Sequence, residues 1–145
     1  MALATYAPDE VSIVIGAVIV SGFADGTFID IEEMSDGVSS VAGADGEVAR
    51  ATSADPRKKV TLTLLQTSDT NDVLSELYAA DKVSKNATFP IAVKDLRGRS
   101  LFAASTAWVV KSAKLELGKE VGSREWTLET ADGKLFVGEM TDGTQ

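Results

Sequence analysis

The side chains that could carry chemistry in this chain are carboxylates, lysines, tyrosines and serines, because the sequence contains neither Cys nor His. Those two absences exclude Ser-His-Asp triads, Cys-His dyads, two-His metal sites and thiol redox chemistry. Two carboxylate pairs remain as glycosidase candidates, Glu125 with Glu129 and Glu32 with Glu33. No aromatic-lined cleft is indicated near them, because both tryptophans fall on apolar strand faces that are typical of core packing. Solvated surface acids explain these pairs better, and we expect neither an enzyme nor a bound cofactor.

Asp-Gly dipeptides recur along the chain, at residues 25–26, 36–37, 45–46, 132–133 and 142–143. A calcium site needs about six to eight oxygen ligands from a convergent cluster. The segment Gly43–Glu47 supplies only two acids, so turn formation explains these dipeptides better than metal binding. The phosphate-binding pattern G-x-x-x-x-G-K-[ST] is not found in the sequence either.

Length and charge limit the remaining functions. A chain of 145 residues fits one domain, residues 1–145, that can bury a core of its own. The formal charge of −8, from 22 acidic and 14 basic residues, argues against binding nucleic acid through its phosphates. No apolar run is long enough to span a membrane, and the N-terminus lacks the pattern of a secretory signal. We therefore expect no membrane partner and synthesis in the cytoplasm.

Alternation of apolar and polar residues predicts a mainly β protein. We expect two strands within Val11–Val20 with a turn near Gly16, and further strands over Phe28–Ile31, Lys58–Leu64, Phe89–Val93, Ser100–Leu117, Glu125–Thr130 and Lys134–Gly138. The spacing of apolar residues changes once, from the alternation of a strand to the period of a helix. This change predicts one short helix over Val73–Asp81, after several N-cap candidates. The polar tail Glu139–Gln145 is expected to be frayed. The predicted fold is an antiparallel β-sandwich or barrel with one flanking α-helix.

Face assignments follow from the period of two. In Ser100–Leu117, Phe102 and Trp108 share one face, and both faces are mostly small or apolar. Part of this strand is therefore expected to be covered on both sides. In Glu125–Thr130, the alternation directs Trp126 and Leu128 inward and the glutamates outward.

A long polar insert, Glu32–Arg57, separates the predicted strands Phe28–Ile31 and Lys58–Leu64. Structureless loops of that length are unusual in compact domains and are usually functional or disordered. Its two Asp-Gly pairs, at Asp36 and Asp45, predict a projecting hairpin arm with turns that grips another molecule. Its low apolar content suggests that it orders mainly on docking. The basic run Arg57–Lys59 reads equally well as a solvated strand start or as half of an ionic contact with a neighbour.

The order and spacing of several segments resemble the small tail tube proteins of contractile-tailed bacteriophages. The segments that carry the resemblance are Ser21–Phe28, Gly43–Arg50, Val60–Ser68 with Asn71–Leu74, Phe89–Pro90 with Val93–Asp95, Gly98–Phe102, and Gly118–Glu120 with Arg124–Trp126. This resemblance implies hexameric rings stacked into a hollow tube that conducts double-stranded DNA during ejection, with no catalytic residue.

The same resemblance implies a set of partners. These are other copies of the chain, a sheath protein, a tape measure, a baseplate hub and a tail terminator, while double-stranded DNA passes without specific binding. The protein would belong to the virion and assemble in the host bacterial cytoplasm. The arm would contact the adjacent ring, and the candidate contact residues are Asp36, Gly37, Asp45, Gly46, Glu47, Arg50, Arg57, Lys58 and Lys59.

An acidic lumen would repel phosphates and let DNA slide. The candidate lumen-facing acids are Glu116, Glu125 and Glu129, which we expect on polar strand faces. Three alternative functions remain open. The first is a related assembly component, such as a tube initiator, a baseplate subunit, or a tube subunit of a secretion system or pyocin. The second is a carbohydrate-binding or receptor-binding β-sandwich. The third is a carboxylate-dependent hydrolase.

Overall fold

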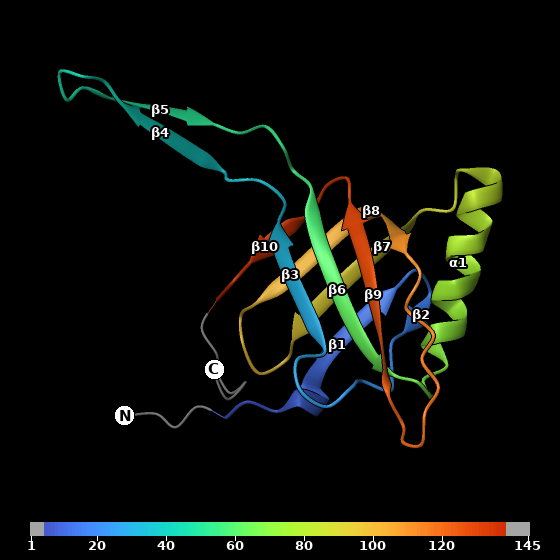
Figure 1. The fold of residues 1–145 in the computed structure, drawn as a ribbon. Helices are drawn as coiled ribbons and strands as arrows, with labels where there is room; N and C mark the ends of the chain where they lie inside the picture. The colour runs from blue at the N-terminus through green and yellow to red at the C-terminus, as the bar shows by residue number, and fades with distance from the viewer. Residues whose placement is uncertain (1–4, 139–145) are drawn as a thin grey trace.

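An antiparallel β-sheet that curls on itself forms the body of the protein, seen here in a computed structural model that describes residues 5–138 (Figure 1). The elements in chain order are η1 (Pro8–Glu10), β1 (Val11–Ile15), β2 (Val18–Ile19), β3 (Ile29–Glu33), β4 (Val38–Ala42), β5 (Val48–Thr52), β6 (Lys58–Leu65), α1 (Thr70–Ser84), β7 (Phe89–Asp95), β8 (Leu101–Lys111), β9 (Ser123–Thr130) and β10 (Lys134–Phe136). The strand order is β2-β1-β7-β8-β9-β6-β3, with β10 paired to β8 and the β4–β5 hairpin standing apart. This arrangement confirms the predicted fold class. The tail Glu139–Gln145 lies outside the described residues.

The core lies between the two halves of the curled sheet, with β3, β6 and β9 crossing in front of β1, β7 and β8 (Figure 1). In β6, Val60, Leu62 and Leu64 are fully buried, as their alternation with polar residues predicted. Trp126 and Leu128 of β9 point inward beside them, also as predicted. Burying one such side chain contributes about 1.5–3 kcal/mol, so this strand pair stabilises the body strongly.

Strand β8 differs from its prediction in length and in the faces of its residues. It ends at Lys111, and residues 112–117 form no strand. Its buried residues are even-numbered at Phe102 and Ala104 but odd-numbered at Ala107 and Val109. The change occurs because Ile91 of β7 pairs with Ala104 and Phe89 pairs with Ala107, so β8 has one more residue than β7 between these two pairs. This is a β-bulge, which inserts one unpaired residue into the ladder. The bulge turns Trp108 out of the core, contrary to the prediction, and residues 101, 103 and 105 stay exposed in the subunit.

Helix α1 is longer than predicted, running from Thr70 to Ser84 at the side of the body opposite the hairpin (Figure 1). It starts two residues after Ser68, whose hydroxyl accepts a hydrogen bond from the Thr70 amide. Leu74 is its fully buried apolar contact with the core, and the Trp126 indole N–H donates to the side chain of Asn71 at 2.9 Å. Among residues 5–138 there is no helix with the length and apolar character that a membrane span requires.

Candidate assembly surfaces

The β4–β5 hairpin forms the outer part of a projecting arm, residues 34–57, that leaves the body between β3 and β6 (Figure 1). Its tip is the Asp45-Gly46 turn, as predicted: Gly46 has a φ of +90°, a conformation that glycine adopts without steric cost. The Glu47 amide donates to the Asp45 carboxylate at 3.1 Å, and the Gly43 amide donates to the Glu47 carbonyl at 2.7 Å. These contacts close the turn and fix the register of the two arm strands.

The second Asp-Gly pair, Asp36-Gly37, occupies the opposite end of the hairpin. It forms a bend where the arm strands begin, and the Gly37 carbonyl accepts a hydrogen bond from the Ser53 amide at 2.9 Å. The pair therefore marks the start of the hairpin ladder, whereas Asp45-Gly46 reverses the chain.

The root of the arm is held by one carboxylate. Asp55 accepts a hydrogen bond from the Ser35 hydroxyl at 2.7 Å and two from the Arg57 guanidinium at 2.9 Å each. The hydrogen bonds from Arg57, and then from Ser35, hold the pKa of the Asp55 carboxyl well below its usual range. This arrangement ties the outgoing and returning chains together. It also means that the charge of Arg57 is already matched within its own subunit.

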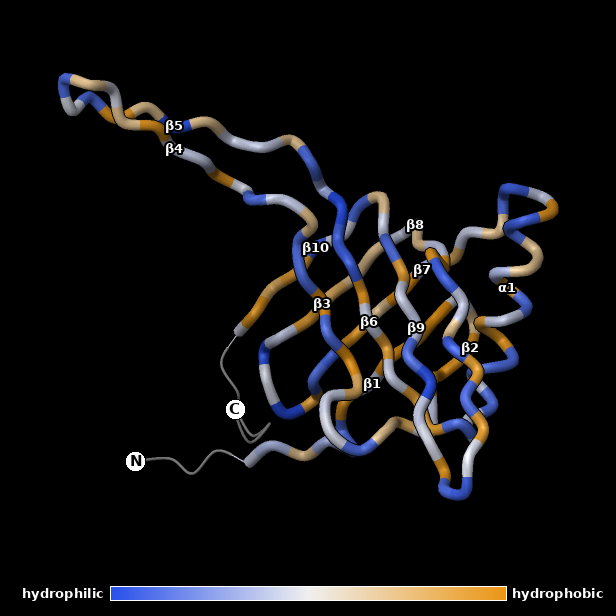
Figure 2. The backbone as a smooth tube through the Cα atoms, viewed as in Figure 1, coloured by the Kyte–Doolittle hydropathy of each residue, from blue (hydrophilic) through white to orange (hydrophobic). Residues whose placement is uncertain are grey.

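Every residue of β4 and β5 is exposed, although the hairpin carries three valines (Figure 2). The register places Arg50 opposite Ser40, on the same face as Val38 and Val48. The guanidinium of Arg50 forms no hydrogen bond or ion pair with any described residue. The opposite face carries only small neutral side chains, at positions 39, 41, 49 and 51. An isolated two-stranded hairpin is marginally stable in water, so these faces are suited to a partner surface.

The basic residues at the return of the arm belong to the body. Lys58 starts β6 and is only 6% exposed, with its ammonium 3.8 Å from the Glu33 carboxylate and bonded to the Pro56 carbonyl. The charge of Lys58 is thus buried and matched within the subunit, and its contact with a neighbour stays a prediction. Lys59 is exposed on the sheet, opposite Glu32 of β3. The sheet includes Glu32 and Glu33, so the arm begins later than predicted, at residue 34.

A charged face covers the outside of β3, β6 and β9. Directly opposed residues in an antiparallel sheet share a face, and the register joins Glu32, Lys59 and Glu129 in one row. The other polar residues of this face, read from the same register, are Asp30, Thr61, Thr63, Glu125 and Thr127. Two of the three predicted lumen acids, Glu125 and Glu129, thus lie together with Asp30 and Glu32, which were not among the lumen candidates.

Glu116 lies elsewhere, outside any strand, in the segment between β8 and β9. The expectation that it sits on a polar strand face was wrong, because β8 ends before it. Its carboxylate pairs with the Lys114 ammonium at 2.8 Å, and this hydrogen bond lowers the pKa of Glu116. Glu116 does line an open groove with Glu125 and Lys111, at the border of the charged face.

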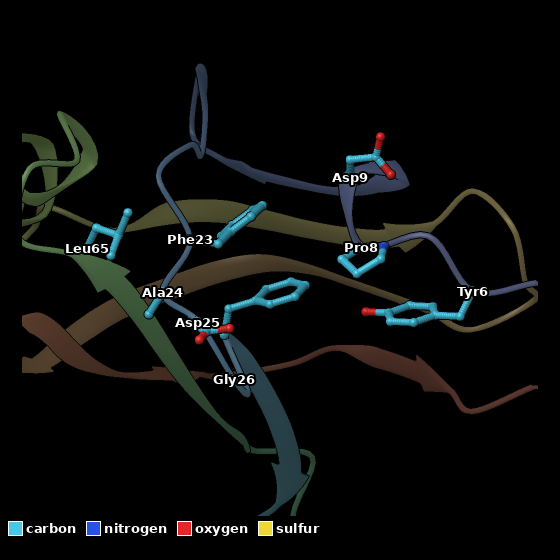
Figure 3. A pocket seen from close by; sticks show the side chains of 9 residues that line it. Tyr6, Pro8, Asp9, Phe23, Ala24, Asp25, Gly26 and Leu65 are labelled. Atoms are coloured by element: carbon cyan, nitrogen blue, oxygen red, sulfur yellow. The ribbon is translucent and has the colours of Figure 1, made fainter.

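An open pocket of about 590 Å³ lies at the end of β3 that is remote from the arm. Its floor is the stacked pair Phe23 and Phe28, with ring centroids 4.6 Å apart and an interplanar angle of 24°. The half-exposed ring of Tyr6 closes one side, and the carboxylates of Asp9 and Asp25 lie on opposite sides of the opening (Figure 3). Neither carboxylate forms a hydrogen bond or ion pair with any residue in the described range 5–138.

From the sequence, only a turn at Asp25-Gly26 is predicted in this part of the chain. The available signal was two phenylalanines five residues apart around an Asp-Gly turn. Nothing in that spacing reveals that a chain reversal will stack the rings. Across residues 5–138, the structure holds no group of three or more acidic side chains placed to bind a metal ion.

The curled sheet with its helix and arm is similar to solved structures of contractile injection machines. One is from a cryo-EM structure of the anti-feeding prophage cap, described as a tube-terminating cap, with a TM-score of 0.62, 11% identity and coverage of 94% of this chain and 93% of that one. Another is from an extracellular contractile injection system, described as the PVC sheath/tube terminator in the extended state, with a TM-score of 0.60, 11% identity and coverage of 92% and 97%. At this identity the likeness establishes the fold.

Sequence comparison identifies the family of the chain. The family model described as Bacteriophage PhiTE tail tube protein matches residues 4–138, and the chain belongs to this family. It is also 30% identical, over 132 residues, to the structural protein ORF10 of Pseudomonas phage KPP10, covering 86% of this chain and 76% of that protein. The protein is therefore a structural component of a phage tail and not an enzyme, and its place is the virion.

Proposed function

We propose that this chain is the subunit of the inner tail tube, that it self-assembles into stacked hexameric rings, and that the tube conducts double-stranded DNA during ejection. The observation that carries the proposal is the arm. Residues 34–57 leave the body and keep every residue of their two strands exposed, including three valines. Burial against another copy removes this apolar surface from water, and a head-to-tail contact that does not close generates a filament.

Ring formation uses the two ends of the strand order. β3 and β2 each have one edge without a partner strand in the described sheet. Unpaired edges invite pairing with another chain, and closure into a ring removes them. The resemblance to contractile-tail tube proteins supplies the expected number of six subunits for each ring.

The charged face of β3, β6 and β9 is the face that we assign to the lumen. It carries the carboxylates of Asp30, Glu32, Glu125 and Glu129, against the single ammonium of Lys59. Burying several charges in a protein interface is costly, whereas a water-filled lumen keeps them solvated. Their excess negative charge repels the phosphates of DNA, so the wall binds its cargo weakly and lets it pass.

The remaining partners and the place of assembly follow from the proposed role. A tube inside a contractile tail contacts a sheath protein outside, a tape measure inside, a baseplate hub at one end and a tail terminator at the other. Assembly takes place in the host bacterial cytoplasm, where the components are made. The two solved structures with the same fold suggest a second candidate, a ring that terminates the tube.

Electron microscopy of the purified chain separates these candidates. A tube subunit forms long tubes of uniform width at high concentration, whereas a terminator forms single rings. Removing residues 36–53 and joining the ends with two glycines is expected to leave a folded subunit that forms no long tubes. Unfolding temperature checks the fold, because the body loses no buried residue in this deletion. Tubes of normal length from the deleted chain would overturn the role of the arm.

The lumen assignment has its own test in assembled phage. Exchanging Glu125 and Glu129 for Lys is expected to permit assembly and to slow DNA ejection, because the wall would then attract phosphates. Glu76→Lys on the exposed face of α1 makes the same kind of charge change on another surface and serves as the control. Ejection kinetics equal to those of wild type in the double variant would remove these two residues from the lumen.

A further inference from the structure

The arm and the aromatic pocket lie at opposite ends of the subunit. β3 begins beside Phe28, which lines the pocket, and ends at Glu33, where the arm leaves. β6 runs back from Lys58, at the arm, to Leu65, which also lines the pocket. Eight residues of strand span about 26 Å, at roughly 3.3 Å per residue. The arm projects away from this end of the sheet, so its strands point away from their own pocket (Figure 1).

The pocket has the chemistry of a site for a cationic side chain. A guanidinium is attracted to the face of an aromatic ring, and it forms paired hydrogen bonds with carboxylates. The stacked rings of Phe23 and Phe28 provide the aromatic surface. Asp9 and Asp25 also line the pocket, on opposite sides of the rings in the view of Figure 3, and their carboxylates have no partner in the described chain. The pocket is lined by no basic residue that would repel such a group.

The arm presents a matching group. Arg50 is the only basic residue between Val38 and Thr52, and its guanidinium has no partner among the described residues. Val38 and Val48 lie on the same face of the hairpin and are 53% and 65% exposed. Other exposed cations near the arm are less available, because Arg57 is bonded to Asp55 and Lys59 lies in the sheet opposite Glu32.

We infer that Arg50 of one copy docks in the Phe23–Phe28 pocket of the next copy along the tube, between the carboxylates of Asp9 and Asp25. The valines beside Arg50 then cover the apolar rim. This inference rests on the proposed function and specifies it. The occupant is a second copy of the same chain. Because arm and pocket lie at opposite ends of the subunit, the contact is head-to-tail, and every added ring exposes a new set of pockets.

Engineered cysteines test the contact directly, because the chain contains no Cys of its own. In a chain that carries both Arg50→Cys and Asp25→Cys, mild oxidation of assembled tubes is expected to produce a ladder of disulfide-linked multimers. The matched control pairs Arg50→Cys with Ser75→Cys, which is exposed on α1, and is expected to give no ladder. Absence of multimers from the test pair, or a disulfide within one subunit, would overturn the inference.

Charge variants provide a second measurement that does not depend on cysteine geometry. Arg50→Asp is expected to raise the concentration needed for tube formation by about tenfold or more, because it replaces attraction with repulsion. Combining Arg50→Asp with Asp25→Arg is expected to restore much of the loss. Unchanged assembly of the single variant would refute the docking and leave the tube function standing. Failure of the wild-type chain to form tubes would instead refute the proposed function.

Discussion

The chain runs through β3, β4, β5 and β6 in turn, with β3 paired to β6 in the body and β4 paired to β5 in the arm. The surroundings of these two strand pairs differ. β6 alternates buried and exposed residues and is flanked by β3 and β9. β4 and β5 pair only with each other and bury nothing. The body is thus stabilised by its own apolar burial, whereas the arm has only its hydrogen bonds and its root contacts. Folding and assembly are therefore assigned to different parts of one hairpin, and they can be perturbed separately.

The largest expected effect comes from the body. Leu62→Ala removes a fully buried side chain from the centre of the core and is expected to lower the free energy of unfolding by about 2–5 kcal/mol. Val41→Ala in the arm, where the side chain is 67% exposed, is expected to change it by no more than about 0.5 kcal/mol. Urea denaturation of unassembled subunits measures both. Similar losses in the two variants would contradict the division between body and arm.

Glycine substitutions give a smaller and more local contrast. Gly133 has a φ of +149°, and a Cβ there would lie 2.8 Å from a ring carbon of Phe102. Gly133→Ala is therefore expected to lower the free energy of unfolding by about 1–3 kcal/mol. Gly46 also has a positive φ, +90°, but a Cβ at the arm tip meets nothing within 4 Å. Its backbone strain is confined to the hairpin.

The readouts for these two variants differ accordingly. Gly46→Ala is expected to leave the urea midpoint of the body unchanged and to speed hydrogen exchange of residues 43–47, which form the tip. If Gly46→Ala shifted the midpoint as much as Gly133→Ala does, the arm would be part of the cooperative folding unit after all.

Much of this division can be read from the sequence, because the period of two is strict where one face alone is buried. Val60, Leu62 and Leu64 alternate with polar residues, and the structure buries all three. The arm is equally visible, since its small polar residues cannot form a core and its Asp45-Gly46 pair has the turn chemistry of a hairpin tip. The arm bounds were off by two residues because Glu32 and Glu33 are charged residues within a strand.

Features that depend on contacts between distant segments were not predictable in the same way. The bulge in β8 arises opposite Pro90, which has no amide hydrogen to donate to the ladder, while both faces of β8 are apolar enough to suit either register. Pro90 is the second residue of β7, which is an interior strand. The Phe23–Phe28 pocket likewise depends on a chain reversal and on Tyr6 from the N-terminal segment.

The smallest effect concerns the carboxylate at the root of the arm. The pKa of Asp55 is lowered from 3.8 chiefly by its hydrogen bond from Arg57, so the unfolded chain takes up the proton first as the pH falls. The contribution of the ionised Asp55 carboxylate to the stability of the folded arm root is complete above pH 3.8. This contribution is lost progressively as the pH falls toward the lower pKa of the folded state. Asp55→Asn, compared with wild type, is expected to loosen the root of the arm slightly at neutral pH and to converge with wild type in acid, with Ser35→Ala intermediate because one hydrogen bond is lost. The NMR shift of the Arg57 amide, recorded on the unassembled subunit as the pH is lowered, follows this convergence. A difference that widened below pH 3.8 would show that the root depends on the shape of the side chain, not on its charge.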